Sequence, residues 1–260
     1  MKVQILMSTM NKSKISDLDL NNRNIFSDIL IINQTNDESV QEERNNIRMI
    51  SVLGKGTSPS RNRALGESSG DICIWADDDI VYVKDYKEIV LSAFEKYKDA
   101  DVITFQIKHP DDTPFKSNYM QKHRKHTLRT SLKCASIEIA FKREAVLNKN
   151  IKIDPEFGLG ARYRIHDDVI FIADAVKAGL KVYYEPIPIV IHPKESSGTI
   201  YNDFLVTSKG AAFYRIFGNA GYLVDIAFAL MKYKDYKSKY SISKFIKLIL
   251  SGTTEYKKTH

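Results

Sequence analysis

The chain has few cysteines, and its first residues do not resemble a secretion signal. Cys73 and Cys134 are the only cysteines in 260 residues, and they lie far apart in apolar stretches. We therefore expect neither a disulfide framework nor a cysteine metal site, and a reducing, cytoplasmic setting is the simplest interpretation. Residues 1–10 lack a basic start followed by a long apolar stretch, so we expect a first strand there and not a signal peptide.

No apolar run is long enough to cross a bilayer. The longest run, residues 220–231, is interrupted by Asp225 and is shorter than the ~20 residues that a transmembrane helix needs. The net charge is +7, from 39 basic and 32 acidic residues, and the excess lies towards the C-terminus. This excess favours phosphate-bearing partners or an anionic membrane surface. Basic and aromatic residues share no stripe, so a nucleic-acid partner is not expected.

Residues 1–107 alternate between strand-length apolar runs and helical patterns. One helix begins near Ser58, with Pro59 at its first position, and a second covers residues 84–97. The alternation predicts an α/β fold in which a mainly parallel, mixed sheet is flanked by helices. Ligands of such sheets bind outside the carboxyl ends of the strands. The expected strands are residues 3–7, 28–32, 47–52, 72–75 and 102–107.

The second half of the chain is less regular. Residues 109–130 are polar and basic and predict a long loop, followed by a strand at 134–141 and a short helix at 143–147. The last strand, residues 181–191, contains Pro186 and Pro188, so we expect a bent strand or an edge strand. We predict a domain of residues 1–200, with a nucleotide-binding half at about 1–107 and an acceptor half at about 108–200, and a C-terminal helical extension of residues 201–260.

Asp77, Asp78 and Asp79 directly follow the apolar strand that contains Trp75. Three adjacent carboxylates repel one another unless a cation or several donors lie beside them. In an extended segment, Asp77 and Asp79 point to one side and Asp78 points to the other. A Mg2+ or Mn2+ ion held by one carboxylate and by diphosphate oxygens suits this pattern, because it neutralises charge on a departing nucleotide. The alternative is an acidic surface turn.

A glycine-containing loop at residues 54–58 enters the helix that carries Arg61 and Asn62. Backbone amides at a helix N-terminus, together with arginine, favour phosphate groups. Such loops are also ordinary connectors. The loop precedes the three aspartates by one helix and one strand, so both segments are expected to converge at one edge of the sheet.

Two later segments also hold candidate residues. A helix begins with Asp167 and Asp168, after a turn at residues 157–160, and ends at Gly179. One aspartate can cap the helix, and the other is free to remove a proton from an acceptor hydroxyl. His192 follows the last strand and is a candidate for the metal shell or the diphosphate, although a lone histidine is more often structural.

Taken together, these residues resemble family 2 glycosyltransferases of the GT-A fold, especially bacterial enzymes that build surface polysaccharides. The resemblance covers about residues 1–200, with matching order and spacing. The matching segments are Ser8-Thr9-Met10-Asn11, Ser60-Arg61-Asn62, Asp77-x-Asp79, Phe157-Gly-Leu-Gly160, Asp167-Asp168, and His192 followed by Ser196 and Ser197.

The resemblance implies an inverting transferase that uses Mn2+ or Mg2+ and moves a sugar from a nucleotide-sugar, with UDP as the first choice, to a glycan or lipid-linked acceptor. It implies that Asp79 binds the metal, with His192 as a second candidate ligand, and that Asp168 is the catalytic base. Asp167 stands where the family has glutamate, so Asp167 is the alternative base. The donor nucleotide-binding candidates are Ser8, Thr9, Asn11, Gln34, Arg61, Asn62, Asp77 and Asp78.

Two other functions fit the same sequence. A sugar nucleotidyltransferase also uses a metal and carboxylates at a parallel sheet, but its longer glycine- and arginine-rich signature after the first strand is missing here. A non-catalytic carbohydrate-binding relative keeps the fold but has no need of both acidic sites. For the basic C-terminal helices we expect either peripheral contact with the inner face of a membrane or ordinary packing with solvated lysines.

Overall fold

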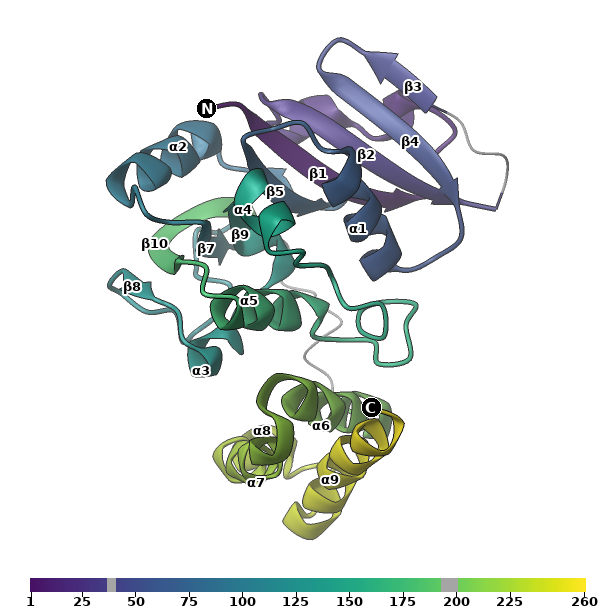
Figure 1. The fold of residues 1–260 in the computed structure, drawn as a ribbon, viewed down its shortest axis with the longest axis vertical. Coiled ribbons are helices and arrows are strands. Elements are labelled where there is room, and N and C mark those ends of the chain that lie inside the picture. Colours follow the sequence, from purple (N-terminus) through teal and green to yellow (C-terminus); the bar gives the residue numbers. More distant parts are fainter. Residues whose placement is uncertain (37–40, 193–200) are drawn as a thin grey trace.

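One mixed sheet runs through the computed structural model, which describes residues 1–36, 41–192 and 201–260 (Figure 1). The strand order is β3-β4-β2-β1-β5-β9-β7-β10-β6, and β8 pairs with β10 beside this path. The central strands are parallel, whereas β9 runs antiparallel to both β5 and β7. This arrangement confirms the predicted α/β fold. The strands are β1 (Val3–Met10), β2 (Asp28–Thr35), β3 (Gln41–Arg44), β4 (Ile47–Leu53), β5 (Ile72–Asp77), β6 (Val81–Tyr82), β7 (Val102–Lys108), β8 (Arg124–Lys125), β9 (Ile139–Lys142) and β10 (Val182–Ile191).

Helices cover both faces of the sheet and continue below it in Figure 1. The α-helices are α1 (Thr57–Glu67), α2 (Tyr86–Lys96), α3 (Leu128–Ser131), α4 (Arg143–Asn148), α5 (Asp167–Lys177), α6 (Asp203–Phe217), α7 (Gly221–Met231), α8 (Tyr233–Tyr236) and α9 (Ile242–Thr259). Short 3-10 turns are η1 (Ile15–Asp17), η2 (Leu20–Arg23), η3 (Ser136–Glu138) and η5 (Gly218–Ala220).

The apolar core follows the two-residue period of the strands. On β1, Ile5 and Met7 face the apolar cluster that includes α2, whereas Leu6 faces the cluster shared with α1, α4 and α5. Trp75 of β5 is almost fully buried on the second face, with its ring centroid 5.0 Å from that of Phe141 and 5.9 Å from that of Phe171. These contacts fix α5 against the sheet, just behind the aspartates that follow β5.

The C-terminal helices form a compact unit beneath α5, far from β3 and β4 (Figure 1). Helices α6 and α9 cross at two glycines, where backbone touches backbone. A Cβ atom on Gly210 would lie 1.9 Å from the Ile249 carbonyl oxygen, and one on Gly252 would lie 1.9 Å from that of Thr207. The prediction of a helical C-terminal segment is confirmed. In the part of the chain that the structure describes, no helix has the length and apolar character to cross a membrane.

Two local predictions need correction, and one strand was missed. Residues 134–138 are not part of a strand, because the Glu138 carboxylate accepts a hydrogen bond from the Ala135 amide (2.8 Å) and closes the η3 turn, so β9 starts at Ile139. Strand β3 has no apolar alternation and was not predicted. The prolines of β10 bend it, with register shifts between Tyr184 and Val190, but it is not an edge strand because it pairs with β7 on one side and with β6 and β8 on the other.

Candidate active site

The acidic segment turns sharply where β5 ends. Asp77 is the last residue of the strand, and Asp78 and Asp79 occupy a turn. The expected alternation of their side chains is therefore wrong. Asp78 instead accepts a hydrogen bond from the Thr9 hydroxyl of β1 (2.5 Å), and Asp79 Oδ2 lies 3.6 Å from His192 Nε2 at the end of β10. The turn thus points two carboxylates towards the ends of two different strands.

Arg61 joins the two acidic segments of the chain. Its guanidinium donates to Asp167 Oδ2 over 2.6 Å and to Asp77 Oδ1 over 3.0 Å, and its side chain is only 5% exposed. Burial opposes the charge on Arg61, but Asp77, Asp167 and Asp168 outweigh burial and raise the pKa of Arg61. Segments 106 and 16 residues away from Arg61 are therefore held at one point, between the C-terminal end of β5 and the start of α5.

The turn at residues 157–160 closes over this point. Gly158 has a φ of +99°, and a Cβ atom there would lie 2.4 Å from Thr57 Oγ1 and 3.0 Å from Asp167 Cγ, so only glycine fits. The Leu159 carbonyl accepts a hydrogen bond from the Thr57 amide (3.0 Å). This first amide of α1 is therefore occupied, and each terminal nitrogen of Arg61 donates to a carboxylate.

The start of α5 presents two aspartates in different environments. His166 precedes the helix with a φ of +73°, and Asp167 and Asp168 form its first turn. Asp167 is paired with Arg61, whereas Asp168 accepts a hydrogen bond from the Val169 amide (2.7 Å). Burial, and next the charge of Asp167, raise the pKa of Asp168 to about 7. Asp168 is therefore a carboxyl group that changes protonation near neutral pH.

Other predicted donor residues lie at the ends of β1 and β2. Ser8 accepts a hydrogen bond from the Ser60 hydroxyl (2.8 Å), which links β1 to α1. The backbone amide of Asn11 donates a hydrogen bond to the backbone carbonyl of Gln34 (2.9 Å), so these two residues are neighbours. The Gln34 side-chain oxygen is buried and has no hydrogen-bond partner within residues 1–36, 41–192 and 201–260. An unsatisfied buried acceptor of this kind is costly, and a bound ligand donor would satisfy it.

Asn62 has a different environment from the other candidates. Its side-chain amide donates to the Ile153 carbonyl (2.7 Å), and its side-chain oxygen accepts from the Ile153 amide (2.8 Å). Both ends of the amide group therefore hold the segment that leads to the turn at residues 157–160. Asn62 thus positions this segment, since both polar atoms of its side chain hold the backbone of Ile153.

Asp79 and His192 are the residues that suit a divalent ion. The side chain of Asp79 is 65% exposed, and the 3.6 Å separation from His192 brings a carboxylate and an imidazole together. Among the described residues, no group of three or more His, Cys, Asp or Glu side chains is arranged to hold a metal. A pair of protein ligands fits an ion that takes its other ligands from a diphosphate and water. Ser196 and Ser197 lie outside the described residues.

The sequence model of glycosyl transferase family 2 matches residues 29–170, which is more than half of the chain and includes Arg61, Asp77 and Asp168. The chain belongs to this family. None of the curated protein sequences compared with the chain matches it. The solved structures that resemble this glycosyltransferase share little sequence with it, so their likeness shows the fold.

Structures of residues 1–349 of TarS from S. aureus are among these matches. TarS 1–349 in complex with UDP-GlcNAc has a TM-score of 0.68 and 12% identity, over 98% of this chain and 80% of that TarS fragment. TarS without a named ligand has a TM-score of 0.64 and 12% identity, over 94% and 77% of the two chains. A mycobacterial protein has a TM-score of 0.51 and 11% identity, over 83% and 74%. The matches to TarS extend through the C-terminal helices.

Sequence reasoning missed Lys209 of α6, which lies next to the start of α5 in this glycosyltransferase. Its ammonium nitrogen is 3.3 Å from His166 Nε2. No local pattern identifies it, because lysines are common throughout the last sixty residues and nothing in the sequence marks the one that folds against α5.

The buried ion pair of Arg61 with Asp167 predicts that Arg61 contributes much more to stability than its neighbour Arg63. We expect Arg61→Met to lower the free energy of unfolding by about 3–5 kcal/mol, because Asp167 is left buried without its partner. Arg63 is the matched control: it is exposed and pairs with Glu67 one turn along α1 (2.8 Å), so Arg63→Met should cost about 1 kcal/mol or less. Urea unfolding of both variants measures the difference, and equal losses would contradict the bridging role.

Proposed function

We propose that this protein transfers a sugar from a nucleotide diphosphate sugar, with a UDP-sugar as the first candidate, to a hydroxyl of a glycan or lipid-linked acceptor. The observation that carries the proposal is the Arg61 bridge, since it draws the acidic turn after β5 and the acidic start of α5 to one site. Family membership and the UDP-GlcNAc bound to TarS, a protein of the same fold, support a nucleotide-sugar donor. Surface polysaccharide synthesis is the proposed setting.

We place the nucleotide at the carboxyl ends of β1, β2 and β5, where parallel strands of this fold type collect ligands. The unsatisfied acceptor of Gln34 next to Asn11 suits the base or ribose. Asp78 and Thr9 are joined by a hydrogen bond and border the same strand ends. The donor-side residues of the proposal are Ser8, Thr9, Asn11, Gln34, Asp77 and Asp78, with Arg61 acting behind them on Asp77.

Asp79 and His192 are proposed to hold a Mn2+ or Mg2+ ion against the diphosphate. The bound ion would supply positive charge that stabilises the departing nucleotide diphosphate. The exposed carboxylate of Asp79 is open to such an ion, and the imidazole of His192 lies beside it.

Removal of the Asp79 carboxylate should therefore affect donor binding first. We expect Asp79→Ala to abolish the Mn2+-dependent part of UDP affinity, a loss of at least about tenfold, because the ion loses its anionic protein ligand. Titration calorimetry with UDP, in Mn2+ and in EDTA, measures this loss. Glu144→Gln on α4 removes an equally exposed carboxylate elsewhere and should change nothing. An unchanged Mn2+ effect in the Asp79 variant argues against the assignment.

Asp168 is the proposed base, and the pairing of Asp167 with Arg61 supports the choice of Asp168. Asp167 is held in a 2.6 Å ion pair with the buried guanidinium of Arg61, so its carboxylate is already engaged. The raised pKa of Asp168 matches a base that works near neutral pH. Direct attack of the deprotonated acceptor on the anomeric carbon, with departure of the diphosphate on the opposite side, inverts the configuration.

The assignment of Asp168 as the base predicts how the transfer rate depends on pH. Asp168 accepts a proton only when ionised, so kcat/KM should fall about tenfold for each pH unit below its pKa, which burial and Asp167 raise to about 7. We expect Asp168→Asn to keep UDP affinity and to lose at least about 100-fold in transfer at all pH values. Near-normal turnover in this variant, on a donor that the wild type uses, removes Asp168 as the base.

The same variant has a second, independent readout. A carboxyl group whose folded pKa lies above its unfolded pKa destabilises the fold as pH rises between those two values. The Asp168→Asn protein should therefore match the wild-type melting temperature near pH 4 and exceed it at pH 8. A lower melting temperature at pH 8 would show that the Asp168 carboxylate is structurally favourable and is not desolvated as proposed.

The two other functions suggested by the sequence have less support. Family membership favours sugar transfer over nucleotidyl transfer. A buried carboxyl group with a strongly raised pKa beside a second acidic group is typical of catalytic sites, and it would have no use in a relative that only binds carbohydrate.

We also propose that one end of the C-terminal helices contacts the cytoplasmic face of an anionic membrane. Residues 231–247 hold six lysines and one aspartate, so this stretch carries +5 of the net charge of +7. Large exposed apolar side chains lie in the same part of the chain, and Tyr240 ties its loop to Asp203 at the start of α6 (2.6 Å). Charged lysines around apolar side chains suit a lipid surface. The exposed apolar residues are Phe204, Leu230, Met231, Tyr233 and Ile242.

Vesicle binding tests the membrane contact. We expect sedimentation with vesicles that contain phosphatidylglycerol, weakening with salt, and little binding to phosphatidylcholine alone. The double variant Lys234→Glu, Lys237→Glu should reduce binding by at least about tenfold, at about 1 kcal/mol for each lysine. Lys149→Glu with Lys152→Glu, which changes two exposed lysines near α4, is the control. Equal losses in both double variants, or none, would reject this surface.

A further inference from the structure

The C-terminal helices bring a cation to the proposed catalytic base. Lys209 of α6 lies 3.3 Å from the Nε2 atom of His166, the residue that precedes α5 in a left-handed conformation. Burial, and then the charge of Lys209, lower the pKa of His166 well below its ordinary value. His166 is therefore neutral at neutral pH, and its Nε2 atom accepts a hydrogen bond from the Lys209 ammonium group. This contact lies two residues before Asp168.

Helix α6 is anchored so that Lys209 stays in this place. Arg215, later in α6, donates to both carboxylate oxygens of Asp174 on α5 (3.0 and 2.8 Å) and to Asp154 (2.8 Å). Asp154 begins the segment that carries the turn at residues 157–160. Helix α6 is thus tied to α5 and to the segment that begins at Asp154, which holds Lys209 beside the start of α5.

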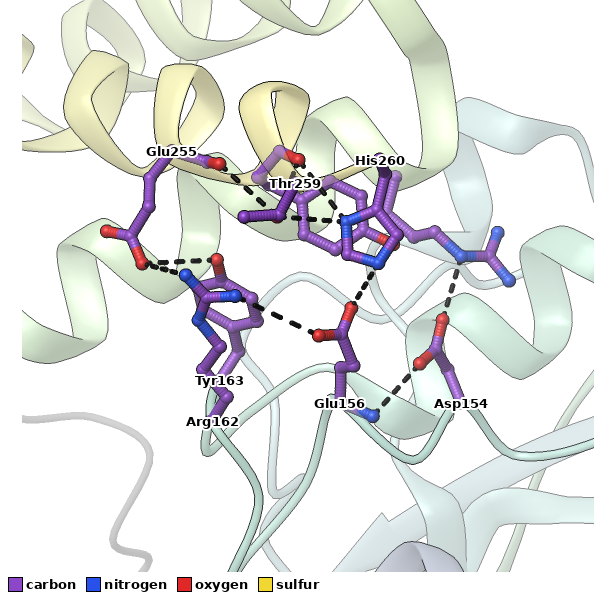
Figure 2. A network of polar contacts seen from close by, with 9 residues as sticks. Asp154, Glu156, Arg162, Tyr163, Glu255, Thr259 and His260 are labelled. Atoms are coloured by element: carbon purple, nitrogen blue, oxygen red, sulfur yellow. Dashed lines mark hydrogen bonds and ion pairs between the residues drawn. The ribbon is translucent and has the colours of Figure 1, made fainter.

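A second set of contacts ties α9 to the same segment (Figure 2). Glu255 accepts a hydrogen bond from Arg162 (2.7 Å), and His260 Nε2 lies 2.7 Å from Glu156. Helix α9 crosses α6 at Gly210, the residue after Lys209. The contacts of Glu255 and His260 therefore also restrain α6 next to the lysine. The helices are therefore joined to the active-site segment through both α6 and α9.

Charged groups reach Asp168 from four elements, and most of them are already paired. Asp167 of α5 opposes its ionisation, whereas Arg61 of α1 and Lys116 of the 109–130 segment favour it. Arg61 is bound by two carboxylates, and Lys116 lies 2.7 Å from Glu138 Oε2. Lys209 differs from both, because its contact is with a neutral imidazole two residues before Asp168, and the negative charge of Asp168 in turn favours the charged form of Lys209.

We propose that Lys209 is a positioning residue that stabilises the ionised form of Asp168, so that the C-terminal helices are a working part of the active site. This inference rests on the proposed function, in which Asp168 is the base. Burial lowers the pKa of Lys209 to about 8, against the opposing charge of Asp168. Lys209 therefore still carries its charge over the pH range in which Asp168 titrates.

A direct titration of Asp168 tests the proposal without an acceptor. In protein labelled with 13C at the aspartate carboxyl carbon, the resonance missing from Asp168→Asn identifies Asp168. In Lys209→Met the midpoint of its titration should rise by about one pH unit, because a nearby positive charge is lost. Lys209→Arg keeps the charge and should stay near the wild type. Lys247→Met, which removes an exposed lysine of α9, should leave the midpoint unchanged.

The transfer reaction gives a second measurement with a distinct signature. The acid limb of the kcat/KM profile of Lys209→Met should move to higher pH by the same amount. The profiles of the variant and the wild type should converge above the pKa of Lys209, because the wild-type lysine is neutral there as well. An unchanged Asp168 midpoint in a folded Lys209→Met protein overturns the inference, as does a loss of rate that is equal at every pH. The proposed function fails separately, if wild-type protein transfers no sugar from any nucleotide-sugar.

Discussion

The buried guanidinium of Arg61 is the constraint on which the rest of the site depends. A buried arginine is tolerable only when carboxylates surround it, and the planar fork of the guanidinium fixes the direction of each partner. Here one partner ends a strand and the other begins a helix more than a hundred residues later. The spacing between the acidic turn after β5 and the start of α5 is therefore fixed by Arg61, and the proposed displacement reaction requires such fixed spacing.

The same constraint gives two adjacent aspartates different chemistry. Asp167 forms an ion pair with Arg61, whereas Asp168 beside it accepts a hydrogen bond from the Val169 amide. Desolvation and the neighbouring charge then keep its proton affinity high. A carboxylate that serves as a base is often obtained in this way, from a pair of acids whose surroundings separate their pKa values.

The sequence predicts features that depend on local pattern. Apolar alternation located the central strands, and the position of the aspartates after Trp75 located the strand end where they cluster. Contacts between segments that lie far apart in the chain could not be predicted from local pattern. The role of Arg61 depends on a carboxylate 106 residues away, and the choice between Asp167 and Asp168 follows from that contact. The turn at Asp78 and Asp79 was missed because residue spacing alone cannot distinguish a strand that continues from one that stops.

Strand β9 has a consequence for how the polypeptide can be divided. It follows β7 in the chain, yet it lies between β5 and β7 in the sheet and pairs with both. A fragment that stops after β7 would expose two unpaired strand edges in the middle of its sheet, beside the acidic cluster, and such edges recruit other chains. The segments before and after β7 therefore build one sheet together, and a cut between them would divide that sheet.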